Sequence, residues 1–150
     1  MTEEEIRIAA DFVRSQTESG APRTGLILGS GLGFFAHEAI EEPVAIAYSD
    51  IPGFPRSTVA GHAGQLILGR VGDEPVACFQ GRFHLYEGYS LSNVTAPVRL
   101  LAQLGAVNLV LTNAAGGIRE GVAPGDFMRI TAHINLIGTS PLIVQNYHHL

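Results

Sequence analysis

Three residues that could bind a small anion and a sugar stand two apart in the sequence: Arg82, His84 and Tyr86. In an extended segment these side chains would share one face, while Phe83 and Leu85 would point the other way into a core. The row combines a fork-shaped cation, a group that titrates near neutral pH and a phenol donor, which suits phosphate and a hydroxylated ligand. The alternative is a half-buried strand with a polar outer face, and this stretch by itself favours neither interpretation.

A glycine-rich turn over residues 29–33 (GSGLG) could supply further anion-binding groups. Its backbone N–H groups can approach an anion closely, and Ser30 adds a hydroxyl donor. Phe34 stands where a dinucleotide-binding fingerprint needs glycine or alanine, and the Gly-Lys-Ser/Thr of a Walker loop is missing. Tight packing between a strand and a helix is the alternative role for this turn.

A second turn of small residues, 113–117 (NAAGG), follows another apolar run. Backbone donors at Ala114 or Ala115 could complete an anion cradle, and Asn113 offers an amide. A close crossing of two backbones is the alternative. Both turns fit the place where α/β sheets bind ligands, outside the carboxyl ends of the strands.

The remaining histidines and the cysteine offer weaker signals. His62 lies among small residues that suit a mobile ligand contact or a solvated loop, and His37 fits a helix surface. His133 fits a core position. The adjacent His148 and His149 are expected to belong to a disordered tail rather than to a metal site. The histidine spacing matches no metal site, and the single cysteine, in an apolar run, is expected to be a packing residue.

Alternating apolar runs and helical patterns predict the α/β sheet that would position these groups. A capping box at Thr2 and Glu5 begins the first helix, and Gly72-Asp73 marks a hairpin. Residues 45–60 are expected to be irregular. We expect helices over residues 3–16, 34–40 and about 90–104, and strands over 25–29, 65–70, 75–79, 107–112 and 127–134, with the strand at 107–112 buried.

Length, composition and charge argue against some classes of function. The chain has 150 residues, 46% hydrophobic and 15% charged, which predicts one globular domain. A net charge of −5, with nine basic residues that form no cluster, argues against a nucleic-acid surface. The acidic N-terminus lacks a signal-peptide pattern and no apolar run is long enough to cross a bilayer, so we expect a cytoplasmic protein without a membrane partner.

Several motifs in order give the sequence a resemblance to a known family. From about residue 5 to 143 it resembles the trimeric purine nucleoside phosphorylases, whose fold is a mixed β-sheet flanked by helices. The motifs are GSGLG at 29–33, GHAG at 61–64, QGRFHLYEGY at 80–89, TNAAGG at 112–117, HINL at 133–136 and GTSPL at 138–142.

The resemblance implies reversible phosphorolysis of purine ribonucleosides or deoxyribonucleosides to the free base and the pentose 1-phosphate. It implies no metal and no organic cofactor, with inorganic phosphate as the second substrate, and a homotrimer in the full-length family. The site residues carried over are Ser30, His62, Arg82, His84 and the backbone of Ala114 for phosphate, with His84 also catalytic, and Tyr86 for ribose.

The resemblance also predicts an incomplete domain. Family members are nearly twice as long, and their purine-recognising glutamate and asparagine and a late ribose-contacting histidine come from the second half. Residues 144–150 depart from the family pattern, so we expect one incomplete domain over 1–150. The alternatives are a catalytically inactive phosphate- or nucleoside-binding fragment and a methylthioadenosine phosphorylase relative. A dinucleotide-binding domain is a distant third.

Overall fold

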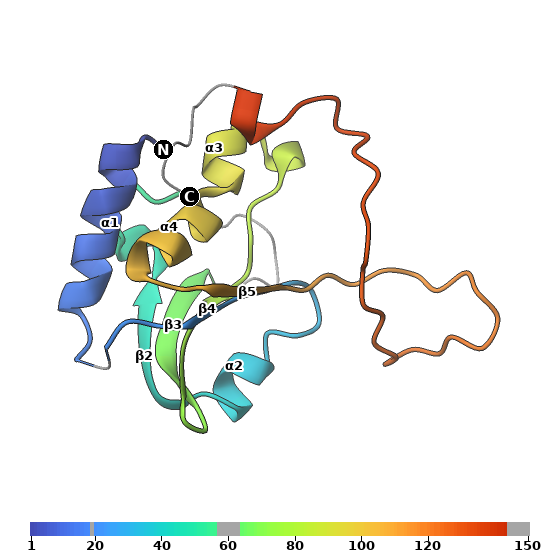
Figure 1. Ribbon diagram of the computed structural model, residues 1–150, viewed down its shortest axis with the longest axis horizontal. Coiled ribbons are helices and arrows are strands. Elements are labelled where there is room, and N and C mark those ends of the chain that lie inside the picture. The colour runs from blue at the N-terminus through green and yellow to red at the C-terminus, as the bar shows by residue number, and fades with distance from the viewer. Residues whose placement is uncertain (19, 57–63, 144–150) are drawn as a thin grey trace.

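The computed structural model describes residues 1–18, 20–56 and 64–143, and these contain a five-stranded mixed sheet in the order β2-β3-β4-β1-β5 (Figure 1). Strand β1 is parallel to both β4 and β5, whereas β3 is antiparallel to β2 and β4. The strands are β1 (Thr24–Leu28), β2 (Glu41–Ala47), β3 (Gln65–Val71), β4 (Glu74–Gln80) and β5 (Asn108–Leu111). The helices are α1 (Glu3–Ser15), α2 (Phe35–Glu38), α3 (Leu91–Val94) and α4 (Ala96–Leu104), with 3-10 turns at Tyr48–Asp50, Leu85–Glu87 and Pro141–Ile143.

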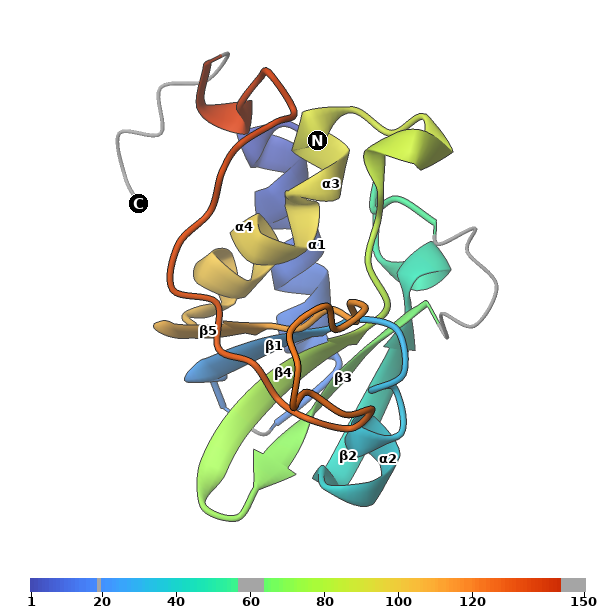
Figure 2. The ribbon, with the colours of Figure 1, turned by 90° about the vertical axis from the view of Figure 1, so that its right-hand side faces the viewer.

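Helices cover both faces of the sheet. Helices α1, α3 and α4 lie on one side and α2 on the other, as Figures 1 and 2 show. Side chains along β4 alternate between the two layers: Ala77 and Phe79 belong to the core under α1 and α4, and Val76 and Cys78 to the smaller core under α2. This alternation follows from the period of two along a strand, and it buries the middle of the sheet on both faces.

The first helix and the hairpin confirm their sequence signals. The Thr2 hydroxyl accepts a hydrogen bond from the Glu5 N–H at 3.2 Å, and the Glu5 carboxylate accepts one from the Thr2 N–H at 2.7 Å. Strands β3 and β4 are joined by Gly72-Asp73, with Gly72 in the left-handed region at φ +58°. Both elements depend on residues a few positions apart, so the local pattern predicts them well.

The helix expected over residues 90–104 is divided in two. Helix α3 ends at Val94, Thr95 separates the helices, and α4 carries Pro97 in its first turn. Proline has no N–H to donate and its ring clashes with the carbonyl four residues earlier, so α3 cannot continue through it.

Three expectations about strands were wrong. Residues 45–47, expected to be irregular, belong to β2, because β3 offers an antiparallel neighbour. Residues 127–134, expected to be a strand, have no regular secondary structure, since none of the described strands pairs with them. Strand β5 forms but is not buried: Leu109, Val110 and Leu111 are 44%, 44% and 61% exposed, because β5 is an edge strand.

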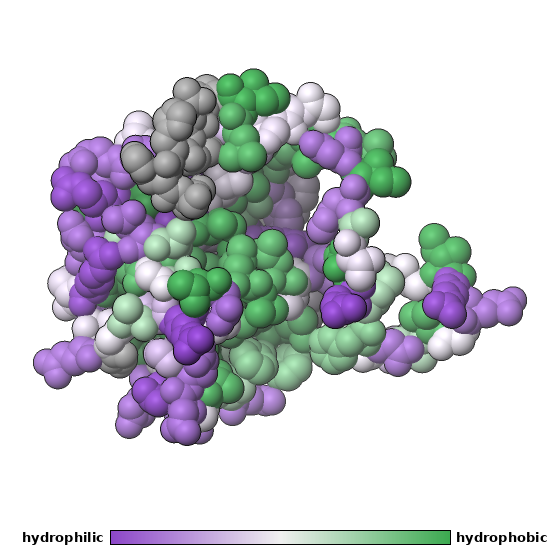
Figure 3. Space-filling model, viewed as in Figure 1, coloured by the Kyte–Doolittle hydropathy of each residue, from purple (hydrophilic) through white to green (hydrophobic). Residues whose placement is uncertain are grey.

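The chain leaves the sheet after β5. Residues 113–140 extend away from it as a long irregular segment (Figure 1), and its apolar side chains are exposed, among them Ile118 and Phe127. Figure 3 shows apolar surface over the middle of this view and at the far end of the segment. No helix in the described ranges is long and apolar enough to span a membrane.

The main core should dominate stability. Leu100 on α4 is fully buried, whereas Val98 on the same helix is 36% exposed. We expect Leu100→Ala to lower the free energy of unfolding by about 2–5 kcal/mol, because it leaves a cavity under the sheet. Val98→Ala, the matched control, should cost about 0.5 kcal/mol or less. Urea denaturation followed by circular dichroism measures both, and equal losses would contradict this description of the core.

Candidate functional site

The candidate site lies where three parallel strands end. Strands β4, β1 and β5 are neighbours that run in the same direction, so their carboxyl ends meet at one edge of the sheet. The residues that follow these ends are Arg82 after β4, the turn at 29–33 after β1, and Thr112 after β5. The predicted phosphate-binding segments are therefore adjacent, although they are far apart in the sequence.

Thr112 joins the three segments. Its hydroxyl accepts a hydrogen bond from the Gly29 N–H at 2.8 Å, and its backbone carbonyl accepts one from Arg82 Nη1 at 3.0 Å. Its own N–H donates to the carbonyl of Ile27 on β1 at 3.1 Å. The Arg82 guanidinium therefore reaches across the end of β1 to the start of the second turn.

Glycine is required at two positions of the first turn. A Cβ at Gly29 would lie 2.5 Å from the Thr112 carbonyl oxygen and 2.9 Å from Asn113 Cα, so only a residue without a side chain permits this approach. Gly31 has φ +85° in open space, a left-handed conformation that L-residues rarely adopt. Ser30, between them, is exposed at the surface of the site.

The row of Arg82, His84 and Tyr86 is only partly extended. The backbone is extended at His84, and a 3-10 turn over Leu85–Glu87 then reverses it. The rings of His84 and Tyr86 consequently stack, with centroids 4.7 Å apart and planes at 14°. The Glu87 carboxylate accepts the His84 backbone N–H at 2.8 Å, which holds this turn closed. Leu85, expected in the core, is 38% exposed because the turn rotates it outward.

Phe83 anchors the row to the core. It is buried and packs at ring-centroid distances of 5.5–5.7 Å against Tyr48, Phe54 and Tyr89. The Tyr48 hydroxyl donates to the Gly81 carbonyl at 2.8 Å, directly before Arg82. Because Phe83 is fixed, its neighbours Arg82 and His84 leave the core in defined directions.

Other predicted site residues are less well supported. His62 lies outside the described residues. Ala114 and Asn113 are exposed beside Thr112, so the second turn is open to a ligand. His133, expected in the core, is exposed, because the segment that carries it does not pack on the sheet.

Cys78 has a structural role. It is fully buried on β4, and burial raises the pKa of its thiol to about 12, so the reactive thiolate is disfavoured at neutral pH. Within the described ranges, no three His, Cys, Asp or Glu residues are placed to hold a metal ion.

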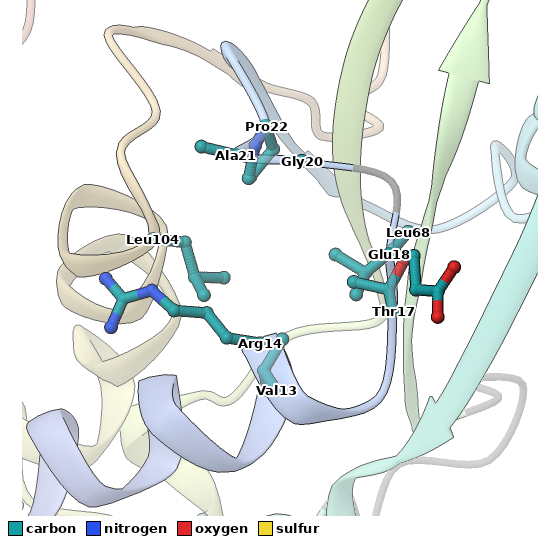
Figure 4. Close-up of a pocket in the computed structure, with 9 residues that line it drawn as sticks. All are labelled: Val13, Arg14, Thr17, Glu18, Gly20, Ala21, Pro22, Leu68 and Leu104. Atoms are coloured by element: carbon teal, nitrogen blue, oxygen red, sulfur yellow. The ribbon is translucent and has the colours of Figure 1, made fainter.

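A pocket of about 300 Å³ lies elsewhere, beside the end of α1 (Figure 4). Its lining includes the apolar residues Val13, Leu68 and Leu104, together with Arg14. The pocket is also lined by Gly20–Pro22, which precede β1, so it lies at the amino end of that strand, away from the carboxyl ends that carry the candidate site.

Comparison with known proteins agrees with this architecture. Residues 23–150 match the model of the phosphorylase superfamily. The chain belongs to this superfamily. It is 55% identical over 141 residues to purine nucleoside phosphorylase 1 of Bacillus subtilis, covering 94% of the chain and 51% of that protein. It is 47% identical to purine nucleoside phosphorylase of Rattus norvegicus over 91% of the chain and 47% of that protein.

Solved structures of superfamily members share the fold. One is isoform 2 of purine nucleoside phosphorylase from Schistosoma mansoni with cytosine and ribose-1-phosphate: 45% identity, TM-score 0.73, over 82% of this chain and 42% of that one. Another is a purine nucleoside phosphorylase in complex with ribose-1-phosphate. It is 40% identical with a TM-score of 0.75, and the match covers 84% of this chain and 46% of that one. The mixed sheet with flanking helices is confirmed, and the chain spans about half the length of the curated relatives it matches.

Two polar residues of the site were missed by sequence reasoning. In the sequence, Thr112 stands out only as the end of an expected strand and the start of a family motif, and Gln80 only as the first residue of the motif at 80–89. A polar residue at the end of a buried strand is a usable signal, because burial forces it to find hydrogen-bond partners. Gln80 is 6% exposed and has such partners in three segments of the chain.

Alanine substitutions at Gly29 and Gly33 should differ in their effect on stability. Gly29→Ala should force the backbones of Gly29 and Thr112 apart and lower the free energy of unfolding by about 1–3 kcal/mol. Gly33→Ala is the matched control: Gly33 lies outside the left-handed region and its Cβ would make ordinary contact with Gln80 at 3.4 Å, so we expect a change of at most about 1 kcal/mol. Urea denaturation compares the two, and a well-tolerated Gly29→Ala would refute the close approach.

Proposed function

We propose that this chain forms the phosphate- and ribose-binding part of a purine nucleoside phosphorylase. The observation that carries the proposal is the junction at Thr112, where Arg82 from β4 and Gly29 from β1 meet the end of β5. Relatives at 47–55% identity are named purine nucleoside phosphorylases, and related structures were solved with ribose-1-phosphate.

Phosphate would be bound by a few converging donors. The Arg82 guanidinium carries five N–H groups, so it can hold the Thr112 carbonyl and still present a fork to an anion. Ser30 would add its hydroxyl, and the exposed backbone at Ala114 would add an N–H. His84 and His62 complete the proposed set. Local capture of this kind suits a chain of net charge −5, whose overall field does not attract anions.

The ribose would lie beside the stacked rings of His84 and Tyr86. Tyr86 is 76% exposed, so its hydroxyl can reach a sugar hydroxyl without prior opening of the fold. Stacking fixes the two rings relative to each other, which lowers the conformational entropy lost on binding.

The reaction that we propose for the complete enzyme is phosphorolysis of the glycosidic bond. The bond between the anomeric carbon and the purine nitrogen would break first, and its electron pair would leave with the base, which takes up a proton. A phosphate oxygen would then form the new bond to the cationic anomeric carbon. The protein would contribute orientation and charge stabilisation, with His84 beside the phosphate, and neither a metal nor an organic cofactor is needed.

The proposal also covers the assembly, location and partners of the complete enzyme. A cytoplasmic homotrimer that acts on purine nucleosides, with no nucleic-acid or membrane partner, is the expected state of the complete enzyme. A phosphate- or nucleoside-binding chain without catalysis, or a methylthioadenosine phosphorylase relative, remains the alternative. Phosphate binding and base release, measured separately, distinguish a catalytic chain from one that only binds; base release from methylthioadenosine tests the second alternative.

Arg82 should be the main phosphate anchor. Arg82→Lys keeps the charge and loses the fork, so we expect phosphate binding to weaken by about 1–3 kcal/mol in titration calorimetry. Arg70→Lys is the control, because Arg70 donates to the Asp73 carbonyl at 2.7 Å within the β3–β4 hairpin, at the opposite end of β4 from Arg82. Unchanged phosphate affinity in Arg82→Lys and Arg82→Ala would remove Arg82 from the site.

The 150-residue chain should bind phosphate better than it catalyses. The family resemblance assigns the purine contacts to positions that this sequence does not contain, and each such donor typically supplies about 10²–10³ in rate. We therefore expect little base release from inosine or guanosine, measured in phosphate buffer against a phosphate-free control. The full-length Bacillus subtilis relative is the positive control. Robust phosphate-dependent release would show that this chain builds a base pocket from other residues.

A further inference from the structure

Gln80 forms a hydrogen-bonded network that the proposed chemistry does not use. It is the last residue of β4 and is 6% exposed. Its amide nitrogen donates to the Gly33 carbonyl at 2.6 Å and lies 2.9 Å from His37 Nε2 on α2. Its amide oxygen accepts from Gln65 Nε2 at 2.7 Å, across the β3–β4 pair.

These contacts fix the orientation of the Gln80 amide. If the amide were flipped, its oxygen would lie 2.6 Å from the Gly33 carbonyl oxygen. That contact would be repulsive whichever way the Gln65 amide is turned, so the nitrogen must face Gly33.

The orientation of the Gln80 amide also determines the tautomer of His37. The Gln80 amide nitrogen carries two hydrogens, one directed to Gly33 and the other to His37 Nε2. A nitrogen that accepts a hydrogen bond carries no proton. In this hydrogen bond His37 Nε2 is the acceptor, so the ring proton lies on Nδ1.

The network is also one of the two anchors of the 29–33 turn. Thr112 holds the start of the turn through the Gly29 N–H, and Gln80 holds its end through the Gly33 carbonyl. Between the anchors, Gly31 has open space around it at φ +85°. The placement of Ser30 and its neighbouring N–H groups therefore depends on both ends being fixed.

We propose that Gln80 is a positioning residue for the anion-binding turn, acting through the Gly33 carbonyl and the Nδ1–H tautomer of His37. Its functional part rests on the proposed phosphate site, whereas the tautomer and the turn geometry can be tested without it. The role is indirect, because Gln80 is buried behind the turn and does not need to touch the phosphate.

Nuclear magnetic resonance on the ¹⁵N-labelled chain tests the structural part. Long-range ¹H–¹⁵N correlations distinguish protonated from unprotonated ring nitrogens, and the His37 signals are assigned by their loss in His37→Ala. We expect the wild type to carry the His37 proton on Nδ1, and Gln80→Leu to lose this preference and shift the Ser30 and Gly31 amide signals. A wild-type proton on Nε2 would overturn the proposal.

Titration of the same samples with inorganic phosphate tests the functional part. We expect Gln80→Leu to bind phosphate about three- to tenfold more weakly, the effect of losing one anchoring hydrogen bond. Gln65→Leu keeps the Gly33 anchor, and Gln103→Leu changes an exposed glutamine on α4, so both should stay within about twofold of the wild type. Wild-type affinity in Gln80→Leu would overturn the positioning role.

Two further outcomes are decisive. If Gln80→Leu loses the dispersed spectrum of a folded chain, Gln80→Glu answers the same question, because it keeps the side-chain shape and places an acceptor against the Gly33 carbonyl. If the wild type binds no phosphate, the proposed function fails, and the His37 tautomer with the Ser30 and Gly31 shifts still decides whether Gln80 positions the turn.

Discussion

The parallel pairing of β1 with strands on both sides is the constraint on which the rest of this structure depends. Residues 24–28 pair with 76–80 of β4, and residues 24–27 pair with 108–111 of β5. Three strands in one direction bring three carboxyl ends to the same edge, and the segments that follow must then pass one another closely. They can do so because Gly29 has no side chain to meet the Thr112 carbonyl, 2.5 Å from where a Cβ would be. A larger residue there would separate the segments that make the site.

The site is rigid where it touches the core and open where a ligand would bind. Phe83 is held by an aromatic cluster, and the Gly81 carbonyl is held by the Tyr48 hydroxyl. Arg82 lies between these two fixed points, so its guanidinium is aimed at the end of β5 rather than into solvent. Ser30 and Tyr86, in contrast, are exposed. Preorganised donors around an open surface are what recognition of a small anion requires.

Hydrogen bonds between side chains and backbone hold much of this site together. Around Thr112 and Gln80, side chains bond to the backbone of neighbouring turns at 2.6–3.0 Å. The ion pairs Arg7–Glu4 on α1 and Arg70–Asp73 at the β3–β4 turn lie remote from these strand ends. Hydrogen bonds of this kind are weakly screened by salt and depend on exact backbone position, so the geometry of the turns should be sensitive to packing beneath them.

The sequence by itself determined the elements whose signals are local: the capping box of α1, the two-residue turn of the β3–β4 hairpin and the glycine turn after β1. It also identified Arg82, His84 and Tyr86 as chemically important, and the order of motifs identified the superfamily. Only the tertiary structure decided which of these meet. The hydrogen bond from Gly29 to Thr112 joins residues 83 positions apart, and that from Arg82 to Thr112 joins residues 30 apart. Sheet order likewise left β5 exposed and residues 127–134 without a partner strand. Such outcomes depend on which distant segments are neighbours, and no short window of sequence contains that information.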